Sequence, residues 1–208
     1  GTTSRPKRVP LRHRNLAVSA SNIVASYALA PDDVSLCIMP LFHVHGLMAS
    51  TLSTLLSGGT VVVQPRFNPL NFWPVVREHS VTWSTAVPTM HQALLARAGR
   101  DKGIGEAGSH DTLRFLRSCS APLGGEAMLE MEDRFGVPVL EAYGMTEASH
   151  QMTSNPLPPL NRVPGSVGPG TGVDVGIMDD AGRLLPPGDR GEVVVKGPNV
   201  IDGYENNP

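Results

Sequence analysis

Short apolar runs alternate with amphipathic segments over the first three quarters of the chain. Continuous apolar runs bounded by glycine or proline are typical of buried parallel strands, and apolar residues at three- and four-residue spacing predict helices. The predicted strands are 34–39, 60–63, 81–86, 113–118 and 137–140, and the predicted helices are 15–27, 47–56, 70–79, 89–98 and 125–135. This alternation predicts an α/β fold, a parallel doubly wound sheet with flanking helices.

The pattern changes near Pro164. A proline-rich stretch without periodicity occupies 155–169, and two further runs, 173–178 and 192–196, resemble antiparallel strands, the first ending at a turn over 179–182. We therefore expect residues 1–164 to form the α/β subdomain of a larger domain and residues 165–208 to start a small antiparallel β subdomain. At the other end, Asn15 is the expected cap of the first helix.

A polar turn follows the strand predicted at 137–140. In Glu141-Ala-Tyr-Gly-Met-Thr-Glu-Ala-Ser-His150 the chain is expected to break at Gly144. Open α/β sheets bind ligands outside the carboxyl ends of their strands. Tyr143 offers a flat ring for a base, Thr146 a hydroxyl for a phosphate, and Glu147 a hard oxygen for a divalent cation. An ordinary strand-to-helix loop is the alternative interpretation of this segment alone.

The first eight residues have phosphate-binding chemistry. Gly1-Thr-Thr-Ser-Arg-Pro-Lys-Arg8 combines hydroxyls, backbone N–H groups and a lysine, a set suited to a polyphosphate. The chain lacks Gly-Lys-Ser/Thr, so this is not the phosphate loop of P-loop NTPases. Residues 103–108 match the dinucleotide fingerprint letter for letter, but they follow a helix and not a strand, so the required context fails.

Charge and composition narrow the class of protein. The net charge is −2 and gives no field that would attract nucleic acid or an anionic membrane. Cys37 and Cys119 form no disulfide framework or metal spacing and are expected in the core. We find no signal peptide and no run long enough to span a bilayer, and expect a cytoplasmic protein with small-molecule partners; a homodimer stays open.

Four ordered motifs resemble those of the adenylate-forming superfamily, which includes acyl- and aryl-CoA synthetases. They are Gly-Thr-Thr-x-x-Pro-Lys7, Ser118-Cys-Ser-Ala-Pro-Leu123, Tyr143-Gly-Met-Thr-Glu147 and Gly191-Glu-Val-Val-Val-Lys-Gly-Pro198. The resemblance implies an enzyme with two half-reactions. A carboxylate attacks the α-phosphorus of ATP and releases pyrophosphate, and a thiol, usually that of coenzyme A, then displaces AMP from the acyl-adenylate.

The resemblance also implies roles for individual residues. Thr2, Thr3, Ser4 and Lys7 would hold the β- and γ-phosphates, and Glu147 with Thr146 would bind Mg²⁺; Lys7, Thr146 and Glu147 are the expected catalytic residues. The expected contacts to the nucleotide base come from both later motifs. They are Ser120, Ala121, Pro122, Glu141, Ala142, Tyr143 and Gly144, although the family often has other residues at positions 141 and 142.

The expected acyl pocket is polar. Its candidates are His43, His45, Ser118, Ser120 and His150, small or hydrogen-bonding side chains that suit a small doubly charged acid better than an aliphatic tail. The surrounding residues resemble the oxalate–CoA ligase branch. That branch often carries alanine at Gly144 and serine at Pro122, so the chain departs from it at both positions.

Purely structural roles are the alternative interpretation of several of these residues. His43 and His45 lack a third metal ligand nearby, and His45 is equally explained as a satisfied core histidine. His79, His91 and His110 are expected in solvent, and Met128 and Met131 in packing. Two other functions stay open: a medium-chain or aryl acyl-CoA synthetase, which an apolar pocket floor would favour, and a degenerate adenylate-binding domain without catalysis.

The ends of the sequence suggest a piece of a longer protein. Gly1 begins inside a functional loop, and the family's ribose-binding aspartate, hinge, catalytic lysine and C-terminal lid domain have no counterpart before residue 208. We expect a central fragment of an N-terminal domain that is inactive by itself. A C-terminal peroxisomal signal cannot be judged from such a fragment.

Overall fold

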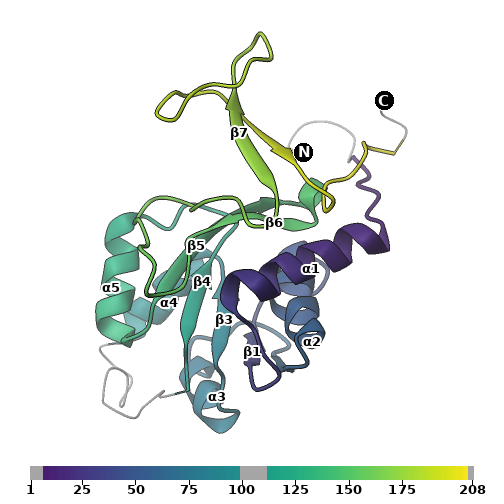
Figure 1. Ribbon diagram of the computed structural model, residues 1–208. Helices are drawn as coiled ribbons and strands as arrows, with labels where there is room; N and C mark the ends of the chain where they lie inside the picture. Colours follow the sequence, from purple (N-terminus) through teal and green to yellow (C-terminus); the bar gives the residue numbers. More distant parts are fainter. Residues whose placement is uncertain (1–6, 99–111, 206–208) are drawn as a thin grey trace.

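The computed structural model describes residues 7–98 and 112–205 (Figure 1). A six-stranded sheet has the order β2-β1-β3-β4-β5-β6, with parallel pairing from β2 to β5 and antiparallel pairing of β6 on β5. The strands are β1 (Val34–Cys37), β2 (Thr60–Val63), β3 (Trp83–Ala86), β4 (Phe115–Ser118), β5 (Val139–Met145) and β6 (His150–Ser154). The predicted α/β class with a parallel sheet is confirmed.

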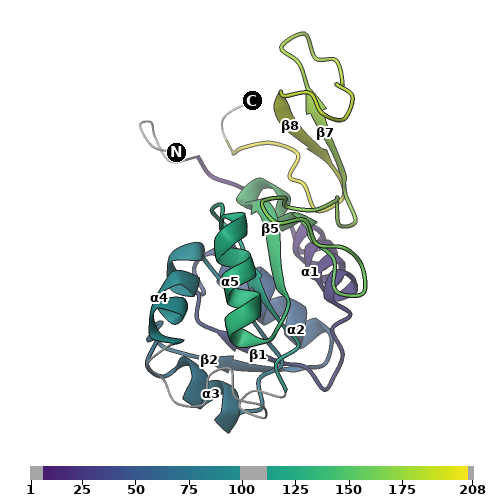
Figure 2. The same cartoon turned by 90° about the vertical axis from the view of Figure 1, so that its left-hand side faces the viewer.

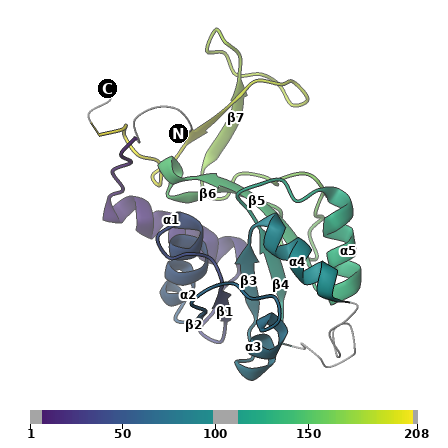
Figure 3. The same cartoon turned by 180° about the vertical axis from the view of Figure 1, so that it is seen from behind.

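Helices cover both faces of the sheet (Figures 2 and 3). They are α1 (His13–Tyr27), the π-helix η1 (His45–Leu52), α2 (Ser53–Leu56), α3 (Phe72–Glu78), α4 (Pro88–Ala98) and α5 (Gly125–Phe135). α1 and the η1–α2 segment lie on one face, and α3, α4 and α5 on the other. Alternate residues of each strand therefore enter different layers.

The two layers have separate apolar cores. Leu116 on β4 packs with Trp73 and Phe135 in the core beneath α3, α4 and α5. Its neighbour Phe115 packs with Tyr27 in the core beneath α1. The same period of two sends Arg117 to the α1 side and Ser118 to the α5 side, so adjacent residues of β4 serve different environments.

The end of β5 differs from the prediction. The strand does not break at Gly144 but continues to Met145, turns through a 3₁₀ segment, η2 (Thr146–Ala148), and pairs with β6, which the sequence pattern did not reveal. A Cβ atom at Gly144 would lie 1.7 Å from the carbonyl oxygen of His150. Glycine therefore permits the approach of β6 at this point, and does not end the strand.

The first helix also begins earlier than expected. α1 starts at His13, and Asn15 is its third residue and not its N-cap. The Asn15 side chain accepts a hydrogen bond from the backbone N–H of Arg12 and donates to the carbonyls of Pro198 and Val200. Asn15 therefore stabilises the helix start and ties it to the C-terminal part of the chain.

The C-terminal part forms a separate small sheet. β7 (Asp174–Met178) and β8 (Glu192–Lys196) pair antiparallel, as predicted, and extend away from the six-stranded sheet (Figure 1). Beyond β8 the chain returns toward the N-terminal residues, where Arg8 and Glu205 form an isolated antiparallel bridge. None of the helices in the described ranges has the length and apolar character needed to cross a membrane.

One ion pair fixes the edge of the parallel strands opposite the predicted site. The Asp33 carboxylate is 2% exposed, and Nη1 of Arg114 lies 2.6 Å from both of its oxygens. Asp33 also accepts hydrogen bonds from Thr82 and from the backbone N–H of Ala30. It thereby connects β1, β3 and β4 at the ends where these strands begin.

We expect Asp33→Asn to lower the free energy of unfolding by about 3 kcal/mol, because it removes one partner of a largely buried ion pair. Urea titration of the full-length protein that contains this chain measures the effect. The control is Asp180→Asn, an exposed aspartate in the turn after β7. A loss at Asp33 no larger than at Asp180 would contradict the structural role of the pair.

Candidate functional site

The predicted base contacts line one cavity at the carboxyl ends of β4 and β5. This cavity has a volume of about 400 Å³. All seven predicted residues line it: Ser120, Ala121, Pro122, Glu141, Ala142, Tyr143 and Gly144. Gly124, Gly165, Val167 and Ser118 complete the lining. Two sequence motifs separated by a helix therefore contribute to a single pocket, at the place where parallel α/β sheets bind ligands.

Backbone geometry and one unsatisfied hydroxyl give this cavity its polarity. Ser120 has φ of +75°, which turns the chain sharply at the end of β4. Ser118 is 2% exposed, and its Oγ has no hydrogen-bond partner within the described part of the chain. The Glu141 carboxylate is occupied by the backbone N–H of Gly165 at 2.9 Å. The hydroxyl of Ser118 is therefore a buried polar group in the pocket wall that is available to a ligand.

Lys7 and Glu147, predicted for phosphate and metal, share one neighbour. The Tyr204 hydroxyl donates to Oε1 of Glu147 at 2.6 Å, and the Lys7 ammonium lies 4.5 Å from the centre of the Tyr204 ring. The hydrogen bond to Glu147 raises the pKa of the Tyr204 phenol. Tyr204 thus brings together groups that are 140 residues apart in sequence (147 minus 7), and sequence reasoning missed it.

The donor set at Glu147 fits magnesium. Mg²⁺ commonly takes one or two protein carboxylates and completes its shell with water and substrate phosphates. No cluster of three or more His, Cys, Asp or Glu side chains capable of holding a metal occurs in residues 7–98 and 112–205. Tyr204 occupies only Oε1 of Glu147, so Oε2 is available to a cation that a nucleotide brings with it.

On the other face of β4, a buried arginine organises the histidines. Arg117 is 0% exposed and contacts His45 at the start of η1 and His150 at the start of β6. The two imidazole rings stack with their centroids 5.1 Å apart, and Nδ1 of His45 lies 3.1 Å from Oγ of Ser120. Ser120 thereby links the histidine–arginine cluster, which consists of Arg117, His45 and His150, to the cavity lined by the predicted base contacts, which we call the base cavity.

The substrate candidates divide between these places. His150 and Ser120 belong to the cluster or touch it, whereas Ser118 lies in the base cavity. His43 is exposed, and its Nδ1 accepts the backbone N–H of His45. His45, for which a core role was equally expected, is the histidine that enters the cluster. Sequence reasoning missed Arg117, although a charged residue inside an otherwise apolar strand was a usable signal.

Both clustered histidines are neutral. Burial lowers the pKa of His45 and of His150 well below the usual value, and the positive charge of Arg117 lowers them further. Neutral imidazoles can accept a hydrogen bond from the guanidinium at one ring nitrogen and donate at the other. The cluster therefore has one positive charge, on Arg117, and two uncharged rings that do not repel it.

His91 corrects a prediction. It was expected in solvent but is 1% exposed beneath α4, because the helix turns it toward the sheet, where it donates from Nε2 to the carbonyl of Arg117 at 3.0 Å. Burial lowers its pKa to about 4, partly offset by that carbonyl. His79 is exposed, and Met128, Met131, Cys37 and Cys119 are buried, all as expected.

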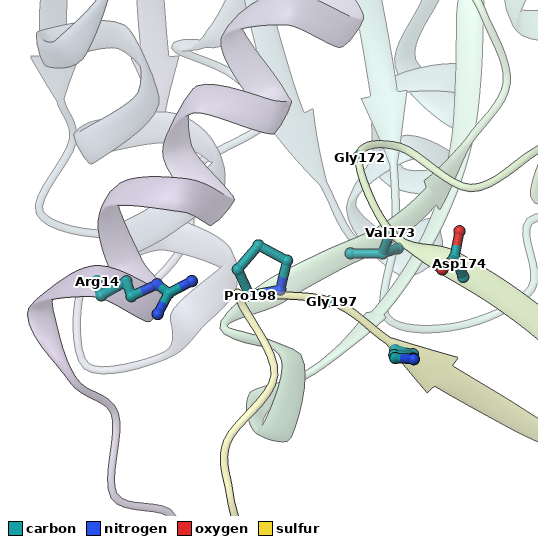
Figure 4. A pocket seen from close by; sticks show the side chains of 7 residues that line it. Arg14, Gly172, Val173, Asp174, Gly197 and Pro198 are labelled. Carbon is teal, nitrogen blue, oxygen red and sulfur yellow. The ribbon is translucent and has the colours of Figure 1, made fainter.

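A second, larger cavity has no predicted site residue among the described residues that line it. It measures about 690 Å³ and lies between α1 and the β7–β8 sheet (Figure 4). Its charged side chains are Arg14, Asp174 and Lys196. These three side chains are exposed and carry both signs of charge, so volume alone does not make the cavity the functional site. Thr2, Thr3, Ser4, His110 and the 103–108 segment lie outside the described residues.

The chain matches the model of the AMP-binding enzyme family over residues 1–205, and it belongs to that family. The oxalate–CoA ligase of Arabidopsis thaliana is 47% identical over 211 residues, covering 100% of this chain and 40% of the relative. An oxalate–CoA ligase of Saccharomyces cerevisiae is 48% identical, with 100% and 37% covered. The chain thus spans about two fifths of these curated relatives.

Solved structures agree with the fold. The crystal structure of ATP-bound MatB from Rhodopseudomonas palustris superposes with a TM-score of 0.90 at 37% identity, covering 100% of this chain and 40% of MatB. The resemblance to adenylate-forming enzymes and the α/β architecture are therefore confirmed.

The buried neutral histidines make stability depend on pH. Because folding lowers the pKa of His91 from 6.5 to about 4, the unfolded state binds more protons over that range, and stability falls as pH drops through it. We expect His91 to account for about 2 kcal/mol of the loss between pH 7 and about pH 5. Urea titrations of His91→Gln at both pH values should show a correspondingly smaller loss.

The matched control is His79→Gln, the same substitution at an exposed position, and the change in pH dependence relative to wild type should be larger in His91→Gln than in this control. An unchanged pH dependence in His91→Gln would show that His91 is not held neutral by burial.

Proposed function

We propose that the protein containing this chain is an ATP-dependent carboxylate–CoA ligase that acts through an acyl-adenylate. The observation that carries the proposal is the convergence of all seven expected base contacts on one cavity, with Glu147 and Lys7 joined through Tyr204. Family membership and the ligase names of the similar proteins support it. We assign residues 1–164 and 165–208 to two subdomains of its adenylation domain.

The two half-reactions need charge neutralisation more than covalent participation by the protein. Tyr143 would stack on the adenine, and Lys7, with Thr2, Thr3 and Ser4, would neutralise the β- and γ-phosphates. Glu147 and Thr146 would hold Mg²⁺, which supplies positive charge to the phosphates when bound. Positioning a carboxylate against a triphosphate overcomes the repulsion between two anions, and coenzyme A then takes the acyl group as AMP leaves.

We further propose that the acid is a small dicarboxylate such as oxalate. The side of β4 next to the base cavity is polar, and its cluster combines a fixed cation with hydrogen-bonding rings. Such a set of buried donors pairs with a carboxylate, whereas an aliphatic or aryl tail would leave it unsatisfied. The identities to oxalate–CoA ligases favour the same acid.

Acid-dependent ATP–pyrophosphate exchange by the full-length protein tests the assignment. We expect exchange with oxalate at least about tenfold faster, in kcat/KM, than with octanoate or coumarate, since a buried hydrogen-bonding site rejects acids that leave it unpaired. Preference for octanoate or coumarate would overturn the dicarboxylate and keep the ligase. Absence of exchange with all three acids, in folded protein that retains its native circular dichroism, would overturn the ligase.

We expect Glu147→Gln to lower the exchange rate about 100-fold and to raise the Mg²⁺ concentration needed for half-maximal rate, because the amide is a weaker cation ligand. The measurement is a Mg²⁺ titration of exchange. Glu126→Gln, at an exposed glutamate of α5, is the matched control and should behave as wild type. Equal Mg²⁺ requirements in both variants would remove Glu147 from the metal site.

A further inference from the structure

Arg117 is a fully buried cation without an acidic partner. Its Nε lies 2.7 Å from the Tyr27 hydroxyl, and Nη2 lies 3.0 Å from Oε1 of Gln151. Within residues 7–98 and 112–205, none of its hydrogen bonds or ion pairs involves a carboxylate. The described part of the chain therefore holds an uncompensated positive charge next to the base cavity. Burying a charge without a partner costs free energy.

Because a guanidinium can only donate, it sets the direction of the neighbouring hydrogen bonds. Nη1 of Arg117 donates to Oγ1 of Thr85 at 3.0 Å. Nη1 also lies 3.4 Å from Nε2 of His45, so this ring nitrogen must accept, and the Thr85 hydroxyl, 2.6 Å away, donates its hydrogen to it. His45 must therefore carry its proton on Nδ1 and donate it to Oγ of Ser120 at 3.1 Å. The Ser120 hydroxyl hydrogen stays free to point into the cavity that Ser120 lines.

A second branch acts on His150 in the same way. Nη2 of Arg117 lies 3.2 Å from Nε2 of His150, which must accept, so this ring also carries its proton on Nδ1. Within the described ranges Nδ1 of His150 has no hydrogen-bond partner. The stacked ring of His45 restrains its orientation. Arg117 thus converts two ambiguous imidazoles into donors of fixed direction.

Among the described residues, no carboxylate forms a hydrogen bond or an ion pair with Arg117, His45 or His150. The titratable and charged groups around the two rings are Arg117 on β4, Tyr27 on α1, His43 before η1 and His91 on α4, together with Cys119 beside Arg117. None of these groups is a carboxylate; the Glu141 carboxylate lines the neighbouring cavity, where it accepts the backbone N–H of Gly165. The positive charge therefore has no counter-ion from the described protein groups.

We propose that Arg117 is a positioning and specificity-determining residue, and that the carboxylate of the acid that does not react supplies its missing counter-charge. In this arrangement Arg117 does not touch the substrate. It fixes His45 and His150 as Nδ1–H tautomers, so that the Ser120 hydroxyl and Nδ1–H of His150 donate to that carboxylate. This inference rests on the proposed ligase function.

Steady-state kinetics of the full-length protein with oxalate and with acetate, which lacks the second carboxylate, test the role. We expect Arg117→Met to raise the KM for oxalate about 10- to 100-fold, the range for hydrogen bonds to charged groups, while the KM for ATP changes less than about twofold. The preference for oxalate over acetate should fall by a similar factor. Arg117→Lys retains the charge and should recover part of that preference.

The pH profile distinguishes positioning from simple loss of packing. Removing the guanidinium takes away a charge that opposes protonation of both rings, so in Arg117→Met the rings should take up their second proton at a higher pH than in wild type, and the acid limb of the pH profile for oxalate should shift in the same direction. Thr85→Val keeps the charge but interrupts the route to His45. It should weaken oxalate binding less than Arg117→Met and shift the acid limb less.

Nitrogen-15 NMR of histidine-labelled protein gives a readout independent of activity. The ring-nitrogen shifts should report neutral Nδ1–H tautomers for His45 and His150 in the wild type, with signals assigned by His45→Gln and His150→Gln. Thr85→Val, which leaves Arg117 buried and is close to isosteric, should disturb the His45 signals and leave those of His150 in place.

Arg114→Met is the matched control, because Arg114 lies on the same strand but pairs with Asp33 away from the cavity. It should lower stability and leave acid preference, pH profile and tautomers unchanged. Two results would overturn the inference, provided that the wild type still catalyses exchange with oxalate. One is the finding of Nε2–H tautomers in the wild type. The other is an acid preference in Arg117→Met and Arg117→Lys equal to that of Arg114→Met. Lack of exchange with any acid in the wild type would instead overturn the ligase.

Discussion

A desolvated guanidinium at the centre of the sheet constrains the surrounding structure. Arg117 has no carboxylate partner among the described residues, so its five donors must find neutral acceptors on α1, β3, η1 and β6. An acceptor lost from any of these elements would leave a buried donor unpaired, at a cost of about 1–3 kcal/mol or more. The packing of β6 and the start of η1 are therefore tied to this one side chain.

The two faces of β4 differ in polarity, which is why the histidine–arginine cluster and the base cavity can differ. Ser118 follows Arg117 and points to the other face, into the base cavity, with its hydroxyl unpaired within the described residues. Because side chains alternate along a strand, the adjacent residues Arg117 and Ser118 of β4 lie in a charged, hydrogen-bonded cluster and in a more apolar pocket, respectively. Ser120, at a backbone conformation with positive φ, is the point where the two environments meet.

Local patterns predicted what depends on nearby residues. The alternation of apolar runs and helices identified the strands of the parallel sheet, and β2 and α5 have the predicted bounds. β6 escaped prediction because His150–Ser154 is polar by composition, and its burial comes from contacts with α1, η1 and β5 that are distant in sequence. His91 was misplaced for a similar reason, since a polar residue on a helix gives no local sign that its face packs on the sheet.

The residues of the site likewise divide into those that a sequence motif indicates and those that only contacts distant in sequence reveal. The resemblance predicted seven residues that contact the nucleotide base, and the structure places these residues around one cavity. Tyr204 and Thr85 carry no motif signal and act only through groups far away in the chain. Gly144 shows how a motif residue gains meaning from such a distant partner. Its missing side chain admits the His150 backbone, and that approach brings the His150 ring to Arg117. Gly144 therefore lies directly on the path that positions the His150 ring beside Arg117.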